Sequence, residues 1–185
     1  MSIVVTGATG TLGGHVATHL LDRGVPPDEV VAGGRDEQRL GALAERGVRT
    51  ARIDYDDPAT LDDAFGSGDR VLLISGSQVG RRVIQHHHVV QAAARAGVAL
   101  VAYTSILNAD DNPVSLAEDH RFTEQALVAS GVPAVMLRNG WYLENYTDQL
   151  ATYQQAGAVL GASGDGRISA AKGSDFATDP PCWVV

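Results

Sequence analysis

The chain contains 185 residues, enough for one domain with a hydrophobic core and too few for two domains of ordinary size. Hydrophobic residues make up 44% and charged residues 19%, which is a globular composition and not that of a disordered or fibrous chain. The net charge is −8 and no basic run is present, which argues against nucleic acid or an anionic membrane surface as a partner.

Features that direct a protein to a membrane or out of the cell are not expected. The apolar runs are much shorter than the ~20 residues that a membrane span needs, and residues 1–6 carry no basic region typical of a signal peptide. The single cysteine, Cys182, cannot form an internal disulfide, which fits the reducing cytoplasm. We therefore expect a cytoplasmic protein, and the sequence leaves a homo-oligomer open.

Short runs of apolar, often β-branched residues predict strands. In chain order they cover residues 3–5, 30–32, 71–74, 98–103 and 134–137. Continuous apolar strands are typical of a parallel sheet that is covered on both faces.

Helices are predicted between these strands, over residues 12–23, 37–46, 79–96 and 115–130, with Asp36 as the N-cap of the second. In the first, Leu12, Val16 and Leu20 share one face. In the third, the apolar face is predicted to contain Val79, Val83, Val90 and Ala94.

Five helix-like stretches end in a glycine that is followed at once by an apolar residue. These glycines are Gly24, Gly47, Gly97, Gly131 and Gly157, each able to adopt the left-handed conformation that turns the chain toward the next strand. The alternation of strand and helix predicts an α/β fold, with a doubly wound, mostly parallel sheet of about six strands in three α/β/α layers.

A glycine-rich loop joins the first strand to the first helix. Gly7, Gly10 and Gly13 follow the pattern G-x-x-G-x-x-G: the first permits a tight turn, the second lets a pyrophosphate approach the backbone, and the third allows close packing of helix on strand. The free N–H groups and positive dipole of the helix N-terminus favour phosphate. This position predicts a dinucleotide site, and a purely structural turn is the alternative.

The residue at the end of the second strand indicates which dinucleotide is bound. NAD-specific proteins usually carry Asp or Glu there, to bind the ribose 2′-hydroxyl, whereas this chain carries Arg35. A guanidinium suits a 2′-phosphate and favours NADP(H) over NAD(H). The alternative is a solvated arginine at the start of a surface helix.

Small hydroxyl residues follow two further strands, at Ser75-Gly76-Ser77 and at Tyr103-Thr104-Ser105. The carboxyl ends of parallel strands form the ligand side of this fold, so these residues can line the adenosine and the nicotinamide ribose. They can also cap the helices that follow, which is compatible with cofactor contact.

The usual acid of a short-chain dehydrogenase is missing. That acid needs Tyr-x-x-x-Lys, whereas the only lysine is Lys172 and no tyrosine precedes it by four residues. A metal is not expected either, because consecutive helical residues such as those of His86-His87-His88 cannot converge on one ion. His120 is of interest because it lies on the helix that carries the tyrosine in ordinary short-chain dehydrogenases.

Several segments resemble one known family. TGATGTLGGHV at the start, LLISGSQVGRR at 72–82, YTSILNAD at 103–110, DHRFTE at 119–124 and LRNGWYLENY at 137–146 are similar to NAD(P)H:quinone oxidoreductase type 2, in the NmrA-like atypical branch of the short-chain dehydrogenases. The resemblance spans nearly all of residues 2–172. It implies a Rossmann fold, NADPH as donor with NADH less favoured, a quinone as acceptor, and neither flavin nor metal.

The resemblance also implies the positions of the functional residues. Cofactor contacts are expected at Gly7, Ala8, Thr9, Gly10, Thr11, Leu12, Gly13, Arg35, Ser75, Gly76, Ser77, Gln78, Tyr103, Thr104, Ser105, Arg138, Asn139, Gly140, Trp141, Tyr142 and Asn145. Trp141 and Tyr142 are expected to form an apolar slot for the quinone, with Asn145 or His120 donating a hydrogen bond to a quinone oxygen. Core packing is the alternative role for Trp141. No catalytic residue is assigned.

Two functions follow from this resemblance. A quinone accepts a hydride and becomes an aromatic hydroquinone anion, so orientation of the two rings supplies most of what direct hydride transfer needs, without a strong acid. The NmrA-like branch also contains redox sensors that bind a dinucleotide and catalyse nothing, and such a sensor is the alternative.

The resemblance ends near the C-terminus of the chain. After Lys172-Gly173-Ser174-Asp175-Phe176-Ala177 the chain departs from the family pattern, and two prolines, Pro180 and Pro181, oppose a helix. We therefore expect residues 1–160 to form the NAD(P)-binding domain. Residues 161–185 are expected to be the incomplete start of a C-terminal substrate lobe, with little support from a core.

Overall fold

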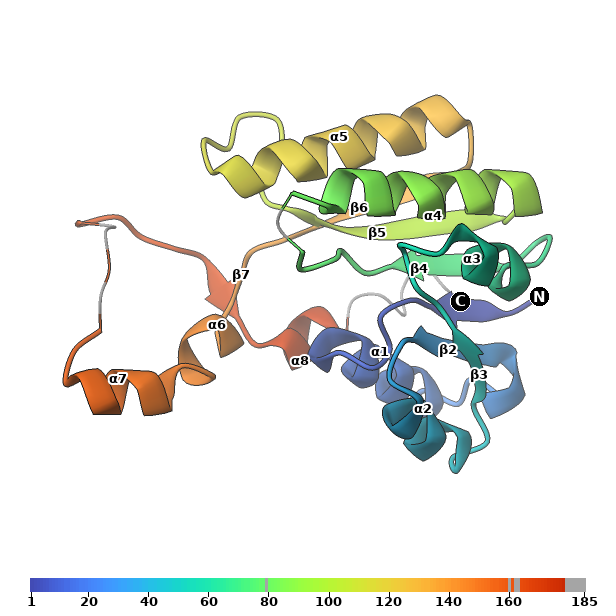
Figure 1. The fold of residues 1–185 in the computed structure, drawn as a ribbon, viewed down its shortest axis with the longest axis horizontal. Helices are drawn as coiled ribbons and strands as arrows, with labels where there is room; N and C mark the ends of the chain where they lie inside the picture. The colour runs from blue at the N-terminus through green and yellow to red at the C-terminus, as the bar shows by residue number, and fades with distance from the viewer. Residues whose placement is uncertain (79, 160, 162–163, 179–185) are drawn as a thin grey trace.

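A six-stranded parallel sheet forms the centre of the computed structural model, which describes residues 1–78, 80–159, 161 and 164–178 (Figure 1). The strand order is β3-β2-β1-β4-β5-β6, and every neighbouring pair is parallel. The strands are β1 (Ile3–Val5), β2 (Val30–Gly34), β3 (Arg49–Arg52), β4 (Arg70–Leu73), β5 (Leu100–Ile106) and β6 (Ala134–Asn139).

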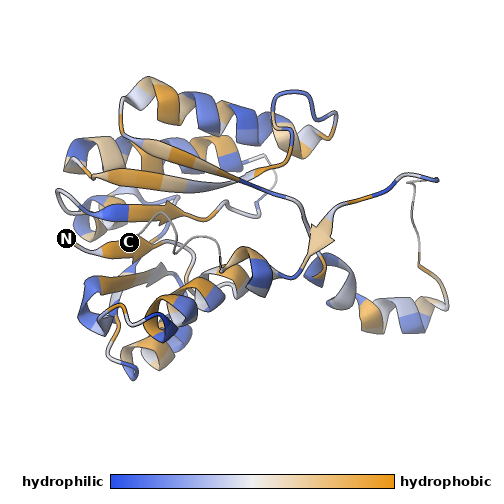
Figure 2. Ribbon diagram, turned by 180° about the vertical axis from the view of Figure 1, so that it is seen from behind, coloured by the Kyte–Doolittle hydropathy of each residue, from blue (hydrophilic) through white to orange (hydrophobic). Residues whose placement is uncertain are grey.

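Helices cover both faces of the sheet. One face is covered by α1 (Thr11–Asp22), α2 (Glu37–Ala44) and α8 (Gly173–Phe176), and the other by α3 (Pro58–Ala64), α4 (Arg82–Ala96) and α5 (Ser115–Ser130) (Figure 1). A short 3₁₀ turn, η1 (Pro27–Glu29), precedes β2. Figure 2 shows hydrophobic residues concentrated in the strands and on the helix faces turned toward them. The predicted three-layer, doubly wound fold is confirmed.

The predicted left-handed conformation of the helix-ending glycines is confirmed as well. Gly24, Gly47, Gly97, Gly131 and Gly157 all have positive φ, between 63° and 85°, and the last three are the left-handed C-caps of their helices. Asp36 caps α2 as predicted, because its carboxylate accepts a hydrogen bond from the Arg39 N–H at 3.1 Å.

The predicted buried face of α4 is correct only in part. Val90 is buried and Ala94 is half-buried, whereas Val83 is exposed and Val79 lies outside the described residues. The buried side chains also include three polar ones, Arg82, Gln85 and His86. A periodicity that counts only apolar residues misses the part of a buried face that is polar.

The chain beyond β6 leaves the sheet and then returns to it. The strands β7 (Trp141–Tyr142) and β8 (Ala170–Ala171) form a separate parallel pair. Between them, α6 (Glu144–Thr147) and α7 (Leu150–Ala156) extend away from the main sheet (Figure 1). After β8, α8 packs on α1, and Ala177 is fully buried in the core of that face. Residues 170–178 therefore have core support, contrary to expectation; Cys182 and both prolines lie outside the described residues.

The packing of α1 on the end of β1 gives a first prediction. A Cβ added at Gly13 would lie 2.3 Å from the Gly7 carbonyl oxygen and 2.7 Å from the Ala8 Cα, backbone atoms that cannot move aside cheaply. We expect Gly13→Ala to lower the free energy of unfolding by about 1–3 kcal/mol or more, measured by urea denaturation.

Gly14→Ala is the matched control. Its added Cβ would meet nothing closer than the Ala8 carbonyl oxygen, at 3.6 Å, and alanine is a better helix former than glycine. Unchanged stability or a gain of up to about 1 kcal/mol is expected. Equal losses at the two positions would contradict the packing argument.

Two buried histidines give a second prediction. Burial, reinforced by the charge of Arg82, lowers the pKa of His86 to about 3 and that of His120 to about 4. As the pH falls from about 6.5 toward these values, the unfolded chain binds protons that the native chain does not. The free energy of unfolding is therefore not reduced by these histidines above about pH 6.5. Below that pH it decreases by about 1.4 kcal/mol per pH unit for each histidine.

Urea denaturation at pH 7, 6 and 5 measures this slope. His86→Gln should remove the share of one histidine from the slope, whereas the same change at the exposed neighbour His87 should leave the slope as it is. A free energy of unfolding that does not change between pH 7 and pH 5 would refute the prediction.

Candidate functional site

The glycine loop lies at the point where the strand order reverses, between β1 and β4. Gly7 has φ +64°, a left-handed conformation that glycine adopts at no steric cost, and it accepts a hydrogen bond from the Gly10 N–H. The Ala8 N–H donates to the Gly33 carbonyl of β2 at 2.8 Å. The loop is thereby fixed to the neighbouring strand, with Gly10 exposed and Gly13 buried at the start of α1.

The N-terminus of α1 has an electrostatic character that suits an anion. Gly10 precedes the helix, no side chain caps it, and the first turn contains no acidic residue. The first N–H groups of a helix have no partner within the helix, so those of Thr11, Leu12 and Gly13 are available, at the positive end of the helix dipole. A phosphate is the group that such a helix start accepts best.

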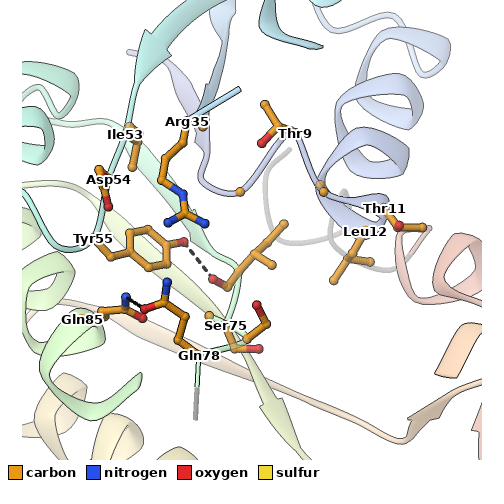
Figure 3. Close-up of a pocket in the computed structure, with 17 residues that line it drawn as sticks. Thr9, Thr11, Leu12, Arg35, Ile53, Asp54, Tyr55, Ser75, Gln78 and Gln85 are labelled. Carbon is orange, nitrogen blue, oxygen red and sulfur yellow. Dashed lines mark hydrogen bonds between the residues drawn. The ribbon is translucent and has the colours of Figure 1, made fainter. Parts of the chain in front are cut away.

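Arg35 follows β2 and contributes the positive charge of the site. Its side chain points into the pocket toward the ring of Tyr55 (Figure 3). None of the ion pairs found among the described residues includes Arg35. Its neighbour Arg39 is engaged, because it pairs with Asp36 at 3.4 Å and donates to the Thr9 carbonyl at 2.7 Å. Of the two guanidinium groups, that of Arg35 is the one free to bind a ligand.

Residues after β3 form a further wall of the pocket and were not predicted. Ile53, Asp54 and Tyr55 line it, and the Tyr55 hydroxyl donates to the Ile74 carbonyl at 2.8 Å and contacts the Thr6 hydroxyl. Burial raises the pKa of Tyr55 above its usual value, so the phenol stays protonated. The sequence offered one indication of this wall: Gly47 ends a helix, so a strand is expected after it, and the residues that follow that strand lie at the ligand side of the sheet.

The loop 75–78, after β4, closes the other side of the pocket. The Ser75 N–H donates to the Thr104 hydroxyl at 2.9 Å, and the Gln78 side chain accepts from the Gln85 amide at 2.9 Å. Gln85 belongs to α4, so this helix contacts the loop from behind and also reaches the pocket itself (Figure 3).

Together these segments enclose a pocket of about 310 Å³ at the carboxyl edge of the sheet. Most of the residues predicted from the loop motif, from Arg35 and from the end of β4 line it, and Ala8 is buried beneath the loop. The lining residues are Gly7, Thr9, Gly10, Thr11, Leu12, Gly13, Gly34, Arg35, Ile53, Asp54, Tyr55, Ile74, Ser75, Gly76, Ser77, Gln78 and Gln85.

The residues predicted at the end of β5 do not line this pocket. Tyr103 is fully buried, and its hydroxyl lies 2.6 Å from Nδ1 of His120, which is itself only 5% exposed. The Ser105 hydroxyl donates to the Glu124 carboxylate at 2.6 Å, while Thr104 supports the loop 75–78 from below. Burial raises the pKa of Tyr103, so this phenol is a poor proton donor.

The residues predicted at the end of β6 lie outside the pocket too. Arg138 pairs with Glu124 at 2.6 Å and with Asp110 at 2.9 Å. Burial favours the protonated form of Glu124, but hydrogen bonds from Arg138 and Ser105 outweigh it and lower the pKa of that carboxyl. This network fixes the end of β6 to α5.

The polypeptide that follows β6 carries the other predicted substrate contacts. Asn139 donates to the Tyr142 hydroxyl at 2.9 Å, and the Tyr142 ring meets Phe176 edge-on at 5.0 Å. Trp141 is 39% exposed, and Asn145 is exposed. At Gly140 an added Cβ would lie 2.6 Å from the Ser169 carbonyl oxygen, so this glycine permits the β7–β8 pairing.

In the part of the chain that the structure describes, no three His, Cys, Asp or Glu side chains are arranged to hold an ion. None of the described helices is both long and apolar enough to cross a bilayer.

Comparison with known proteins agrees with this geometry. Residues 7–179 match a family described as NAD(P)H-binding. The chain is 43% identical to quinone oxidoreductase 2 of Escherichia coli K12 over 95% of its own length, and it spans 61% of that relative. It is 30% identical to the NAD(P)H azoreductase of Xenophilus azovorans over 95% of its length, and spans 60% of that protein.

Solved structures give the same result. The E. coli NADPH-dependent quinone oxidoreductase in complex with NADPH superposes with a TM-score of 0.87 at 43% identity, covering 95% of this chain and 62% of the other. A Citrobacter triphenylmethane reductase complexed with NADP(H) superposes with a TM-score of 0.88 at 34% identity, over 96% and 63% of the two chains. The chain thus belongs to the NAD(P)H-binding family.

Proposed function

We propose that this chain binds NADPH and supplies the cofactor-binding part of an oxidoreductase that reduces quinones by two electrons. The observation that carries the proposal is the pocket itself, in which the glycine loop, Arg35 and the loop 75–78 converge where the strand order reverses. The similarity to the E. coli NADPH-dependent quinone oxidoreductase supports the choice of substrate.

The described residues fit the cofactor. The pyrophosphate would lie on the free N–H groups at the start of α1, because no acidic side chain occupies that position. A 2′-phosphate would face the Arg35 guanidinium, and the adenosine would lie between Arg35 and the Ile53–Tyr55 wall. NADPH, when bound, supplies the hydride.

The chain's own contribution to catalysis is orientation. In the reaction, a hydride and a proton convert quinone to hydroquinone while NADPH becomes NADP⁺, and the aromatic product makes a strong acid unnecessary. The glycine loop, Arg35 and the loop 75–78 would hold the donor at a fixed angle, a service that can lower a barrier by several kcal/mol. The contact of buried Tyr103 with His120 supports a mechanism without a tyrosine acid.

A quinone site is proposed next to the pocket, formed with polypeptide beyond β6. Trp141, Tyr142 and Asn145 are its proposed walls in this chain, and His120 a proposed donor to a quinone oxygen. Large hydrophobic side chains of this region, among them Leu143, Tyr146 and Leu150, are exposed on the arm that extends from the sheet. We propose that residues 1–160 form the cofactor domain and that 161–185 begin a substrate lobe.

Steady-state oxidation of NADPH in the presence of 1,4-benzoquinone tests the function. The assay compares the 185-residue chain with an extended chain, in which Thr178 is joined to the C-terminal region of E. coli quinone oxidoreductase 2. We expect quinone-dependent oxidation by the extended chain and a small fraction of that rate from residues 1–185. Tight NADPH binding by both, with no quinone-dependent oxidation by either, would instead identify a dinucleotide sensor.

Arg35→Glu tests the choice of cofactor. Loss of a charge-assisted contact should weaken NADPH binding by ~1–3 kcal/mol and leave NADH binding nearly unchanged. Isothermal titration measures both affinities. The exposed Arg46, in the turn that follows α2, provides the control, because Arg46→Glu makes the same change in net charge away from the pocket. Equal losses for NADPH and NADH would assign Arg35 a structural role.

Tyr103→Phe in the extended chain tests the mechanism. The change removes the hydroxyl that contacts His120 and should cost stability, about 1–3 kcal/mol, because a buried partner loses its hydrogen bond. Quinone reduction should fall less than about tenfold if no tyrosine acid operates. A thousandfold fall in kcat with unchanged NADPH affinity would show that it does.

A further inference from the structure

Loop 75–78 has no regular secondary structure, yet its backbone is hydrogen-bonded on both sides of one residue, Gly76. The Gly76 N–H donates to Nε2 of His86 at 2.9 Å, and the Gly76 carbonyl accepts from Nε of Arg82 at 2.6 Å. Both partners are side chains of α4, one turn apart, and both are buried. The two polar groups of Gly76 are therefore bound from the same helix.

His86 is set in one tautomer by its second partner. Because Nε2 accepts the Gly76 N–H, the proton lies on Nδ1, which is 2.9 Å from the Thr123 hydroxyl of α5. That hydroxyl in turn donates to the Asp119 carbonyl at 2.9 Å. Burial and the adjacent charge of Arg82 lower the pKa of His86 to about 3, so the ring remains a neutral acceptor at physiological pH.

Arg82 is anchored on the same neighbouring helix. Its NH1 group pairs with the Asp119 carboxylate at 2.8 Å, and its side chain is 8% exposed. A buried charge is costly unless it is paired, and the guanidinium fork satisfies this requirement while its Nε bonds Gly76. Both contacts to Gly76 are thus braced against α5.

The polar face of α4 is directed at the loop 75–78. Arg82, Gln85 and His86 occupy positions i, i+3 and i+4, where a helix on a sheet normally buries apolar groups. Gln85 bonds Gln78 of the same loop, and Gln85, Gly76 and Gln78 all line the pocket (Figure 3). Burial of three polar groups is unfavourable unless each is bonded, and each is bonded to this loop.

We propose that Arg82 and His86 are positioning residues that fix the two peptide groups flanking Gly76 and so keep the loop 75–78 in the shape that binds NADPH. The inference rests on the proposed function, since it takes NADPH as the ligand of the pocket. It adds supporting residues behind the pocket: α5 orients two side chains of α4, and these side chains hold the loop that forms one wall of the pocket.

A pair of variants at His86 separates positioning from stability. His86→Gln places an amide near the position of Nε2 and can still accept the Gly76 N–H. His86→Asn places its amide near Nδ1, so it keeps the contact to Thr123 and loses the one to Gly76. Both remove the ring, and Asn is one methylene shorter than Gln, so the stability of each variant is measured beside its binding. His87→Asn on the exposed face of α4 is the control for the substitution itself.

Two readouts are taken on the 185-residue chain, without reference to activity. Hydrogen–deuterium exchange of the peptide containing residues 75–78 should be faster in His86→Asn and close to the unmodified rate in His86→Gln. The dissociation constant for NADPH should rise about tenfold or more in His86→Asn and recover to within about threefold in His86→Gln. His87→Asn should change neither.

A second variant keeps the test valid if His86→Asn fails to fold. Arg82→Lys retains the positive charge opposite Asp119 but lacks the Nε that bonds Gly76, and it should also weaken NADPH binding about tenfold. Unchanged loop exchange or unchanged NADPH affinity in the folded variants would overturn the inference. If the unmodified chain binds no NADPH, the proposed function fails and this inference with it, which is a different result from equal binding by all variants.

Discussion

The close approach of α1 to the end of β1 is the constraint on which the rest of the site depends. With only a hydrogen at Gly13, the helix starts directly above the Gly7 carbonyl, and its first N–H groups emerge at the reversal of strand order. A helix displaced by one methyl group would lift these groups away from the loop 75–78 and from Arg35. The geometry of the phosphate site and the packing of one face of the core therefore both depend on the contact between Gly13 and the Gly7 carbonyl.

Local patterns in the sequence sufficed for most of the sheet and its helices. Strands such as β4, and the positive-φ glycines at helix ends, follow from short-range chemistry that tertiary contacts did not override. The bounds of β3 could not be predicted, because this edge strand reads Arg-Thr-Ala-Arg and is largely exposed, without an apolar run to identify it. The buried face of α4 was predicted only in part for a different reason: it includes charged and polar side chains whose partners lie elsewhere in the chain.

The candidate site divides in the same way. The glycine loop and Arg35 could be located from one motif and one charge, because strand, turn and helix are contiguous there. Tyr55 could not be located in this way, because it lines the pocket only as a result of the parallel pairing of β3 with β2. The roles assigned to residues 138–145 came from resemblance alone and remain predictions, and the hydrogen bonds of His86 to a loop ten residues upstream have no signature in the sequence.

The helix-ending glycines and the pocket lie at opposite edges of the sheet. Gly24, Gly47, Gly97 and Gly131 each precede a strand, at the amino edge, whereas every pocket-lining loop leaves from the carboxyl edge. Substitutions at the amino edge should therefore act mainly on folding, whereas substitutions in the pocket loops at the carboxyl edge should act mainly on cofactor binding. Gly13 affects both properties, because its close packing sets where α1 begins. Separate libraries randomised at each edge, with Gly13 held constant, would sample the two properties largely independently.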